Sequence, residues 1–200
     1  LAAAGIPYEE FIRRMLVNAQ ERHKSHFPRV RRRRSRAKTA EGPQGMAIRA
    51  TVAADREPIL TMLKDTQFFR ERELVIATEV LSEALEKPDT TYRSFTAELD
   101  GVPAGWVCFG ATPCTVSTFD VYWLVTSPAC QGRGVGKGLM AFAEQEIARL
   151  GGHLVVVETA GRAQYNPTRR FYLNIGYRES ARLPDFYAPG DDKIIYLKAL

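Results

Sequence analysis

A glycine-rich segment near the middle of the chain constrains the fold most strongly. Residues 131–138 read Gln-Gly-Arg-Gly-Val-Gly-Lys-Gly, and they separate an aromatic, β-branched segment at 119–126 from a helical pattern at 134–150. Glycines allow tight turns and bring successive backbone N–H groups close to a ligand, while a helix N-terminus adds unpaired donors and the positive end of its dipole. A strand, a glycine loop and a helix in this order predict a cradle for a phosphate or pyrophosphate, to which Arg133 and Lys137 add positive charge.

Two familiar phosphate-binding motifs fit this loop poorly. A P-loop requires a hydroxyl residue after its lysine, and Gly138 stands at that position. A dinucleotide-binding fingerprint belongs to the first strand–helix unit, whereas this loop follows the fourth expected strand. A turn without a ligand is a further alternative, but packing alone does not readily explain four glycines at the start of one helix.

The chain from residue 46 onward alternates between strand and helix patterns. Asp100-Gly101 between two apolar segments predicts a tight hairpin turn, and Asp55 as N-cap with Pro58 in the first turn marks the start of a helix. The expected strands are 46–52, 91–99, 102–110, 119–126, 153–159, 177–183 and 193–198, and the expected helices are 55–66, 71–87, 134–150 and 167–174. This order predicts one mixed α/β sheet with flanking helices.

The excess positive charge is confined to the N-terminal part. The whole chain carries +5, but residues 1–45 hold 11 Lys and Arg against 4 Asp and Glu, which leaves residues 46–200 slightly acidic. We expect three units: residues 1–27 with an amphipathic helix at 8–24, an arginine-rich linker at 28–45, and the folded domain. A solvated linker is the expectation for the arginines, and an arm that binds nucleic acid or anionic lipid is the alternative, although no aromatic residues are interleaved with them.

Composition argues against several classes of protein. No apolar run approaches the ~18 residues that span a membrane, and the N-terminus shows no secretory signal. Three cysteines (Cys108, Cys114, Cys130) and three histidines are too scattered to indicate a disulfide framework or a metal site. We therefore expect a cytoplasmic protein without a metal ion.

The glycine loop resembles the acetyl-CoA-binding motif of the GNAT N-acetyltransferases, Gln-Gly-x-Gly-x-Gly after a strand. Residues 166–177 (Asn-Pro-Thr-Arg-Arg-Phe-Tyr-Leu-Asn-Ile-Gly-Tyr) resemble the second signature of that family, and the resemblance extends over residues 46–200. It departs at 126–128, where Thr-Ser-Pro stands in place of the common Val-x-Pro. The resemblance implies a mostly antiparallel central sheet, acetyl-CoA as co-substrate, and direct attack of an amine on the thioester.

The same resemblance implies how the coenzyme is held. The fourth and fifth strands separate, so that the backbone of 124–126 pairs with the pantetheine arm and the Leu124 N–H donates to the oxyanion. Asn166 hydrogen-bonds the pantetheine arm or, alternatively, caps the short helix. The expected cofactor-binding residues are Leu124, Val125, Thr126, Gln131, Gly132, Arg133, Gly134, Val135, Gly136, Lys137, Gly138 and Asn166.

Three residues are candidates for proton transfer. Tyr172 occupies the Phe-Tyr position of the second signature, and a phenol near pKa 10 suits protonation of a thiolate near 8.5; the alternative is a core tyrosine. Asp120 is the first candidate base, and alternation places it on one strand face with Tyr122 and Leu124. Glu158 is the second candidate, a water-relayed base is a third possibility, and either carboxylate is alternatively a counter-ion for the amine.

The acceptor pocket is expected between the first two helices and the last two strands. A long acidic and aromatic loop at 184–192 suits an amine cation, and an ordinary polar loop is the alternative. The expected acceptor-binding residues are Phe68, Phe69, Tyr122, Tyr165, Asp185 and Tyr187. We therefore expect an N-acetyltransferase for the primary amine of a small molecule or amino acid.

Two other functions stay open at this point. One is a non-catalytic regulatory module that binds acyl-CoA, and the other is an acetyltransferase that reaches a protein or a nucleic-acid-associated substrate through the basic arm. Residues 1–23, through Ala-Ala-Ala-Gly-Ile-Pro-Tyr at 2–8, resemble the C-terminal end of D-alanine–D-alanine ligases. That resemblance implies fusion or association with such a ligase, and a homodimer is the other partner considered.

Overall fold

The computed structural model describes residues 45–200. The expected amphipathic helix at 8–24, the ligase-like segment at 1–23 and the arginine-rich linker up to residue 44 lie outside the described residues. Within residues 45–200, no helix combines the length and the apolar character needed to cross a membrane.

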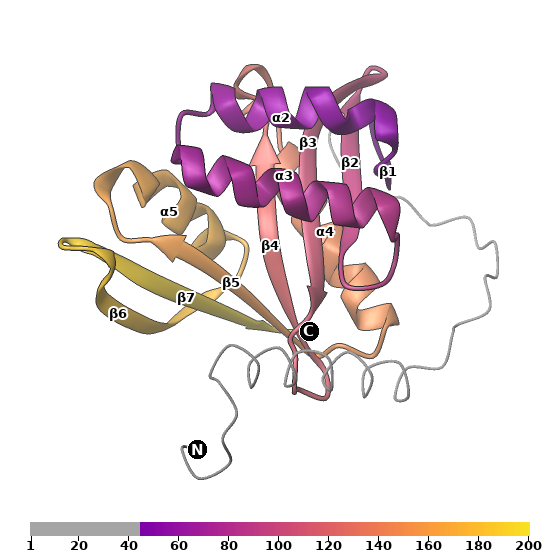
Figure 1. Cartoon of the computed structure of the whole chain (residues 1–200). Coiled ribbons are helices and arrows are strands. Elements are labelled where there is room, and N and C mark those ends of the chain that lie inside the picture. Colours follow the sequence, from indigo (N-terminus) through magenta and orange to yellow (C-terminus); the bar gives the residue numbers. More distant parts are fainter. Residues whose placement is uncertain (1–44) are drawn as a thin grey trace, which may run out of the picture.

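One seven-stranded sheet organises the fold, in the order β1-β2-β3-β4-β5-β7-β6 (Figure 1). Only β4 and β5 run parallel, and every other neighbouring pair is antiparallel. The strands are β1 (Met46–Ala50), β2 (Arg93–Leu99), β3 (Val102–Ala111), β4 (Thr118–Thr126), β5 (Leu154–Ala160), β6 (Arg178–Ala188) and β7 (Asp191–Ala199). The expected mixed, mostly antiparallel α/β architecture is confirmed.

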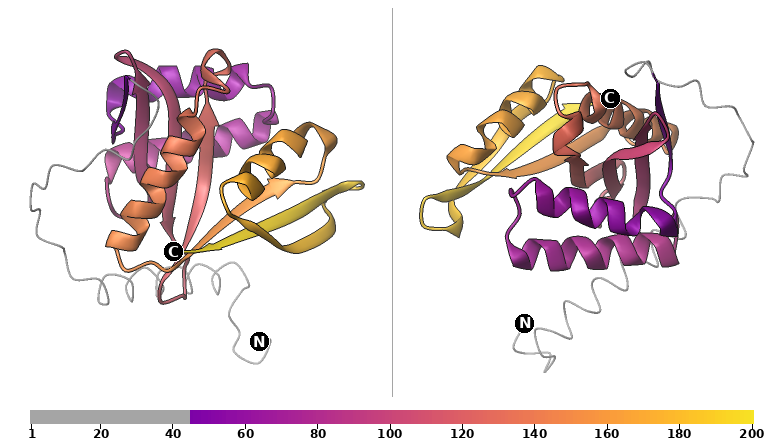
Figure 2. Two further views of the ribbon diagram at one scale, coloured as in Figure 1. Left: turned by 180° about the vertical axis from the view of Figure 1, so that it is seen from behind. Right: turned by 90° about the horizontal axis from the view of Figure 1, so that it is seen from above.

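Helices cover both faces of this sheet (Figure 2). On one face α2 (Arg56–Asp65) and α3 (Glu71–Glu86) pack over Trp106, Cys108 and Val125. On the other face α4 (Val135–Arg149) and α5 (Asn166–Asn174) pack on a larger core. Strand alternation places consecutive residues of β3 in opposite cores, which is why this central strand is buried along most of its length.

Local sequence signals explain one hairpin and mislead at the other. Asp100 and Gly101 both have positive φ, as the expected tight turn between β2 and β3 requires. The expected loop at 184–192 is wrong, because β6 and β7 extend through most of it and leave two residues, Pro189-Gly190, as the connection. Pro184 suggested a loop, but an edge strand such as β6 tolerates proline, because its outer N–H groups have no neighbour.

Asp55 links β1 to α2 through Arg49 and does not act as the helix cap that the sequence predicted. It occupies the N-cap position of α2, but its side chain does not bond the helix amides. Its carboxylate instead accepts from Arg49 at 2.6 and 2.8 Å, from the Val52 N–H at 2.9 Å and from Thr96 at 3.2 Å. Burial alone would raise the pKa of Asp55, but the Arg49 and Val52 hydrogen bonds hold it below its usual value.

We predict that Asp55→Asn lowers the free energy of unfolding by about 2 kcal/mol at pH 7, because hydrogen bonds to a charged partner are lost. The pKa of Asp55 is lower in the folded than in the unfolded chain. Its stabilising effect is therefore complete above the unfolded pKa and is lost as pH falls through the pKa of Asp55 in the folded chain. Urea unfolding at pH 7 and pH 3 should therefore show a smaller difference from wild type at pH 3 than at pH 7. Asp89→Asn, which breaks an exposed ion pair with Arg93, is the control; an equal loss at both pH values would contradict the account.

Candidate active site

β4 and β5 pair only over their first halves. The parallel register ends at Val121 and Val157, although β4 continues to Thr126 and β5 to Ala160. Beyond this point β5, β7 and β6 turn away from the rest of the sheet (Figures 1 and 2). The expected separation of the fourth and fifth strands is thus present, and the outer backbone groups of β4 face a side without a paired strand.

The backbone of Leu124 points toward that side. The Ser127 N–H donates to the Ala104 carbonyl at 2.9 Å, and alternate residues of an antiparallel strand direct their hydrogen bonds to the same neighbour. In this register Val125 bonds toward β3, whereas the N–H groups of Leu124 and Thr126 point away from β3. This orientation fits the donor predicted at Leu124 and a strand-like pairing of β4 with an extended ligand.

A β-bulge in β4 corrects the expected alternation. The register with β3 shifts at Tyr122, which has no partner there, and one extra residue reverses which side chains face each side. Phe119, Val121 and Leu124 consequently all pack in the core on the α4 face, and Asp120 lies on the opposite face. The prediction that Leu124 shares a face with Asp120 and Tyr122 is wrong, because the bulge inserts one residue before Leu124, and no glycine marks the bulge in the sequence.

The two candidate bases lie on the same face of the sheet, on the side of α2 and α3. Burial raises the pKa of Asp120, a hydrogen bond of 2.7 Å from the Thr112 hydroxyl opposes the rise, and the charge of Glu158 adds to it. Glu158 is exposed and forms an ion pair of 2.6 Å with Lys193 on β7. Asp120 is therefore the more protected of the two carboxylates, and no sequence signal predicted its contact with Thr112.

Tyr172 lies in an aromatic cluster on the other face. Its ring centroid is 5.3 Å from Phe171, 5.7 Å from Tyr177 and 5.9 Å from Tyr196. Burial raises its pKa above the usual value, so the phenol stays neutral but is a weaker acid than the ordinary tyrosine assumed from the sequence. This placement is compatible with both alternatives, an acid or a core tyrosine.

The glycine loop has the backbone geometry of an anion cradle. Gly132 and Gly134 have φ of +75° and +83°, a region that side chains disfavour, and α4 begins at the next residue. The Gly138 N–H donates to the Gly134 carbonyl at 2.9 Å, the first hydrogen bond of the α-helix. The N–H groups of residues 135–137 come before it and have no partner within the helix. Arg133 and Lys137 are exposed beside these amides, and the loop fits the diphosphate of a coenzyme.

Two of the predicted acceptor residues meet across the separated strands. Phe68 and Phe69 lie in the connection between α2 and α3, and Phe69 packs 5.2 Å from Trp123 of β4. The Phe68 carbonyl accepts from the Tyr165 hydroxyl at 3.1 Å, and the two rings are 5.4 Å apart. Because Tyr165 belongs to a 3₁₀ turn (Ala163–Tyr165) that follows β5, this connection joins the two halves of the sheet.

The three remaining predicted acceptor residues, Tyr187, Tyr122 and Asp185, lie in different surroundings. Tyr187 is half-exposed, and burial together with the charge of Glu158 raises its pKa to about 12. Tyr122 packs against Tyr92 at 5.2 Å. Asp185 accepts from the Gly190 N–H at 2.6 Å and serves the hairpin turn.

Asn166 also departs from one of its two expected roles. It is the first residue of α5, and its side-chain oxygen accepts from Arg169. No side-chain cap bonds the first amides of this helix, so the capping alternative for Asn166 is wrong. Its contact with pantetheine stays a prediction.

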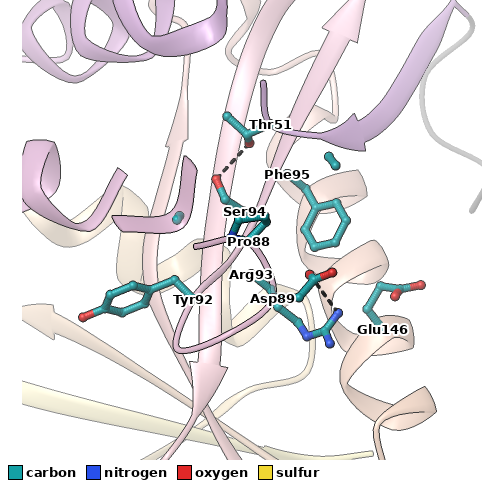
Figure 3. Close-up of a pocket in the computed structure, with 10 residues that line it drawn as sticks. Thr51, Pro88, Asp89, Tyr92, Arg93, Ser94, Phe95 and Glu146 are labelled. Atoms are coloured by element: carbon teal, nitrogen blue, oxygen red, sulfur yellow. Dashed lines mark hydrogen bonds and ion pairs between the residues drawn. The ribbon is translucent and has the colours of Figure 1, made fainter. Parts of the chain in front are cut away.

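A separate cavity of about 270 Å³ lies away from these residues (Figure 3). It is bounded by the ends of β1, β2, α3 and α4, where Asp89 and Arg93 form an ion pair of 3.3 Å. None of the predicted site residues lines it. Within residues 45–200, no group of three or more His, Cys, Asp or Glu side chains is arranged to hold a metal ion.

We predict that Asp120→Asn stabilises the chain at neutral pH, because it removes a partly buried charge without changing the shape of the side chain. Because the pKa of Asp120 is higher in the folded than in the unfolded chain, its charge lowers stability only above the unfolded pKa. The stability gained by Asp120→Asn should therefore shrink as pH falls and Asp120 becomes protonated in both the folded and the unfolded chain. Thermal unfolding between pH 4 and 8 measures this, with the ion-paired, exposed Glu158→Gln as control. If Asp120→Asn were less stable than wild type at pH 8, the account in which burial destabilises the charged Asp120 side chain would be refuted.

Known proteins match this arrangement in sequence. The model of the acetyltransferase (GNAT) family matches residues 58–177. An uncharacterized N-acetyltransferase of Methanocaldococcus jannaschii is 29% identical over 105 residues, which cover 52% of this chain and 64% of that protein. The match therefore spans less than two thirds of the length of that relative.

Solved structures match the fold. A GNAT-family protein of Desulfovibrio desulfuricans is 36% identical, with a TM-score of 0.74 over 77% of this chain and 98% of that one. A Salmonella typhimurium protein crystallised with acetyl-CoA is 19% identical, with a TM-score of 0.58 over 78% of this chain and 94% of that one. The family model spans more than half of the chain, and the chain therefore belongs to the acetyltransferase (GNAT) family.

Proposed function

We propose that the chain transfers an acetyl group from acetyl-CoA to the primary amine of a small molecule or amino acid. The observation that carries this proposal is one combination of backbone groups: a glycine loop with two left-handed glycines before α4, beside a β4 edge whose Leu124 N–H faces the separated β5. Acetyl-CoA supplies the activated thioester, and the chain supplies binding, charge stabilisation and proton transfer.

The loop amides of 132–137, with Arg133 and Lys137, hold the diphosphate. The N–H groups of Leu124 and Thr126 align the extended arm along β4, and the Leu124 N–H stabilises negative charge on the carbonyl oxygen. This arrangement costs little reorganisation, because the amides are fixed by the sheet and by the start of α4.

Asp120 takes the proton of the attacking amine in this proposal. Its raised pKa brings it closer to the working pH of a general base, whereas the charge of Glu158 is already engaged by Lys193. Tyr172, at the Phe-Tyr position of the second family signature, protonates the departing thiolate in this proposal, although burial makes its phenol a weaker acid than a free tyrosine. Trp123 and Phe69 pack together on the same face as Asp120.

The first test is Tyr172→Phe in a steady-state assay of CoA release with a panel of primary amines. We expect kcat to fall roughly 100-fold or more, with KM for acetyl-CoA unchanged, because an acid is lost and the coenzyme contacts are not. Tyr177→Phe removes a hydroxyl from the same aromatic cluster and is the matched control. If no amine raises CoA release above thioester hydrolysis, a coenzyme-binding module without turnover replaces the proposal.

A second test separates coenzyme binding from stability. Gly134 and Gly151 flank the two ends of α4, and both have positive φ. Gly134→Ala and Gly151→Ala should each cost about 1–2 kcal/mol of stability, since both force a side chain into the left-handed region. Only Gly134→Ala should weaken CoA binding measured by calorimetry, by tenfold or more; equal affinities in the two variants would exclude the loop as the diphosphate site.

A further inference from the structure

Three charged side chains that sequence reasoning missed meet beside the predicted acceptor residues. Asp191, the first residue of β7, has a side chain only 4% exposed. Its Oδ2 lies 2.8 Å from Arg70 Nη2, at the start of α3, and 3.1 Å from Arg162 Nε, after β5. A single buried carboxylate therefore holds two guanidinium groups from the two halves of the sheet.

This cluster keeps donors for a second anion. Arg70 gives Asp191 only its Nη2, although a guanidinium carries five N–H donors. The side chains of Arg70 and Arg162 are 47% and 28% exposed, whereas Arg162 Nε itself is buried against Asp191. Asp191 offsets one of the two positive charges, and a second carboxylate, Glu73, accepts from the Arg70 backbone N–H at 2.7 Å.

The cluster lies beside two of the predicted acceptor residues, Phe69 and Tyr165. Phe69, next to Arg70 in sequence, packs on Trp123, which precedes Leu124. Arg162 lies over the ring of Tyr165 at 5.4 Å. The acceptor side thus has an acidic part at Asp120 and Glu158 and a basic part at the two arginines.

We propose that Arg70 and Arg162 bind the carboxylate of an amino-acid acceptor while its amine reaches Asp120. This inference rests on the acetyl transfer proposed above and selects amino acids among the primary amines. A guanidinium fork matches a carboxylate in two parallel hydrogen bonds. Asp191 offsets the repulsion between the two arginines and fixes their orientation before the acceptor arrives, which reduces the entropy cost of binding.

The experiment compares amino acids with their decarboxylated counterparts in the CoA-release assay. The panel holds the standard α-amino acids, β-alanine and γ-aminobutyrate, each beside the amine that lacks the carboxylate. We expect wild type to favour an amino acid over its matched amine at least tenfold in kcat/KM. Arg70→Gln should raise KM for that amino acid tenfold or more, with little change in kcat and none for the matched amine.

Two further variants keep this test independent of folding. Arg70→Gln leaves Arg162 to neutralise Asp191, and Arg162→Lys should retain part of the preference because it keeps the charge but loses the fork. Arg182→Gln removes an exposed arginine from β6 and is the control, with no expected change.

The outcomes separate this inference from the function on which it rests. Acetylation of amines without preference for the carboxylate, or an Arg70→Gln effect equal on both members of a pair, would overturn the acceptor assignment alone. No acetylation of any amine would overturn the proposed transfer as well.

Discussion

The end of the pairing between β4 and β5 is the constraint on which the site depends. Up to Val121 and Val157 the two strands share hydrogen bonds, and beyond that point each has one strand neighbour among residues 45–200, β3 for β4 and β7 for β5. A sheet normally satisfies its backbone groups internally, so the outer N–H groups of Leu124 and Thr126 form a row of donors that an extended ligand can use as a further strand does. The glycine loop directly after β4 places the amides at the start of α4 at the end of that row.

Charge on the other face follows from the same geometry. The bulge at Tyr122 moves Asp120 to the side of α2 and α3, away from the core that holds Tyr172. The proposed base and the proposed acid therefore lie on opposite faces of the sheet. The Arg70–Asp191–Arg162 cluster ties the two halves of the sheet together.

Local signals predicted the parts of the structure that depend on local physics. The turn at Asp100-Gly101, the helix after the glycine loop and the order of elements all follow from residue types over short windows. The bulge at Tyr122 and the long β6–β7 hairpin depend on the register between consecutive strands, which propensity over short windows does not report. The buried ion cluster around Asp191 was missed because Arg70 lies 121 residues earlier in the chain.

The central claim is that backbone amides of β4 and of the glycine loop hold the coenzyme. Backbone amide NMR of the full chain, recorded with and without CoA, tests it most directly. The account predicts that CoA shifts the amide signals of 132–137, Leu124 and Thr126 and slows their exchange with solvent. Binding that leaves these amides unchanged, or no binding at millimolar CoA, would contradict it.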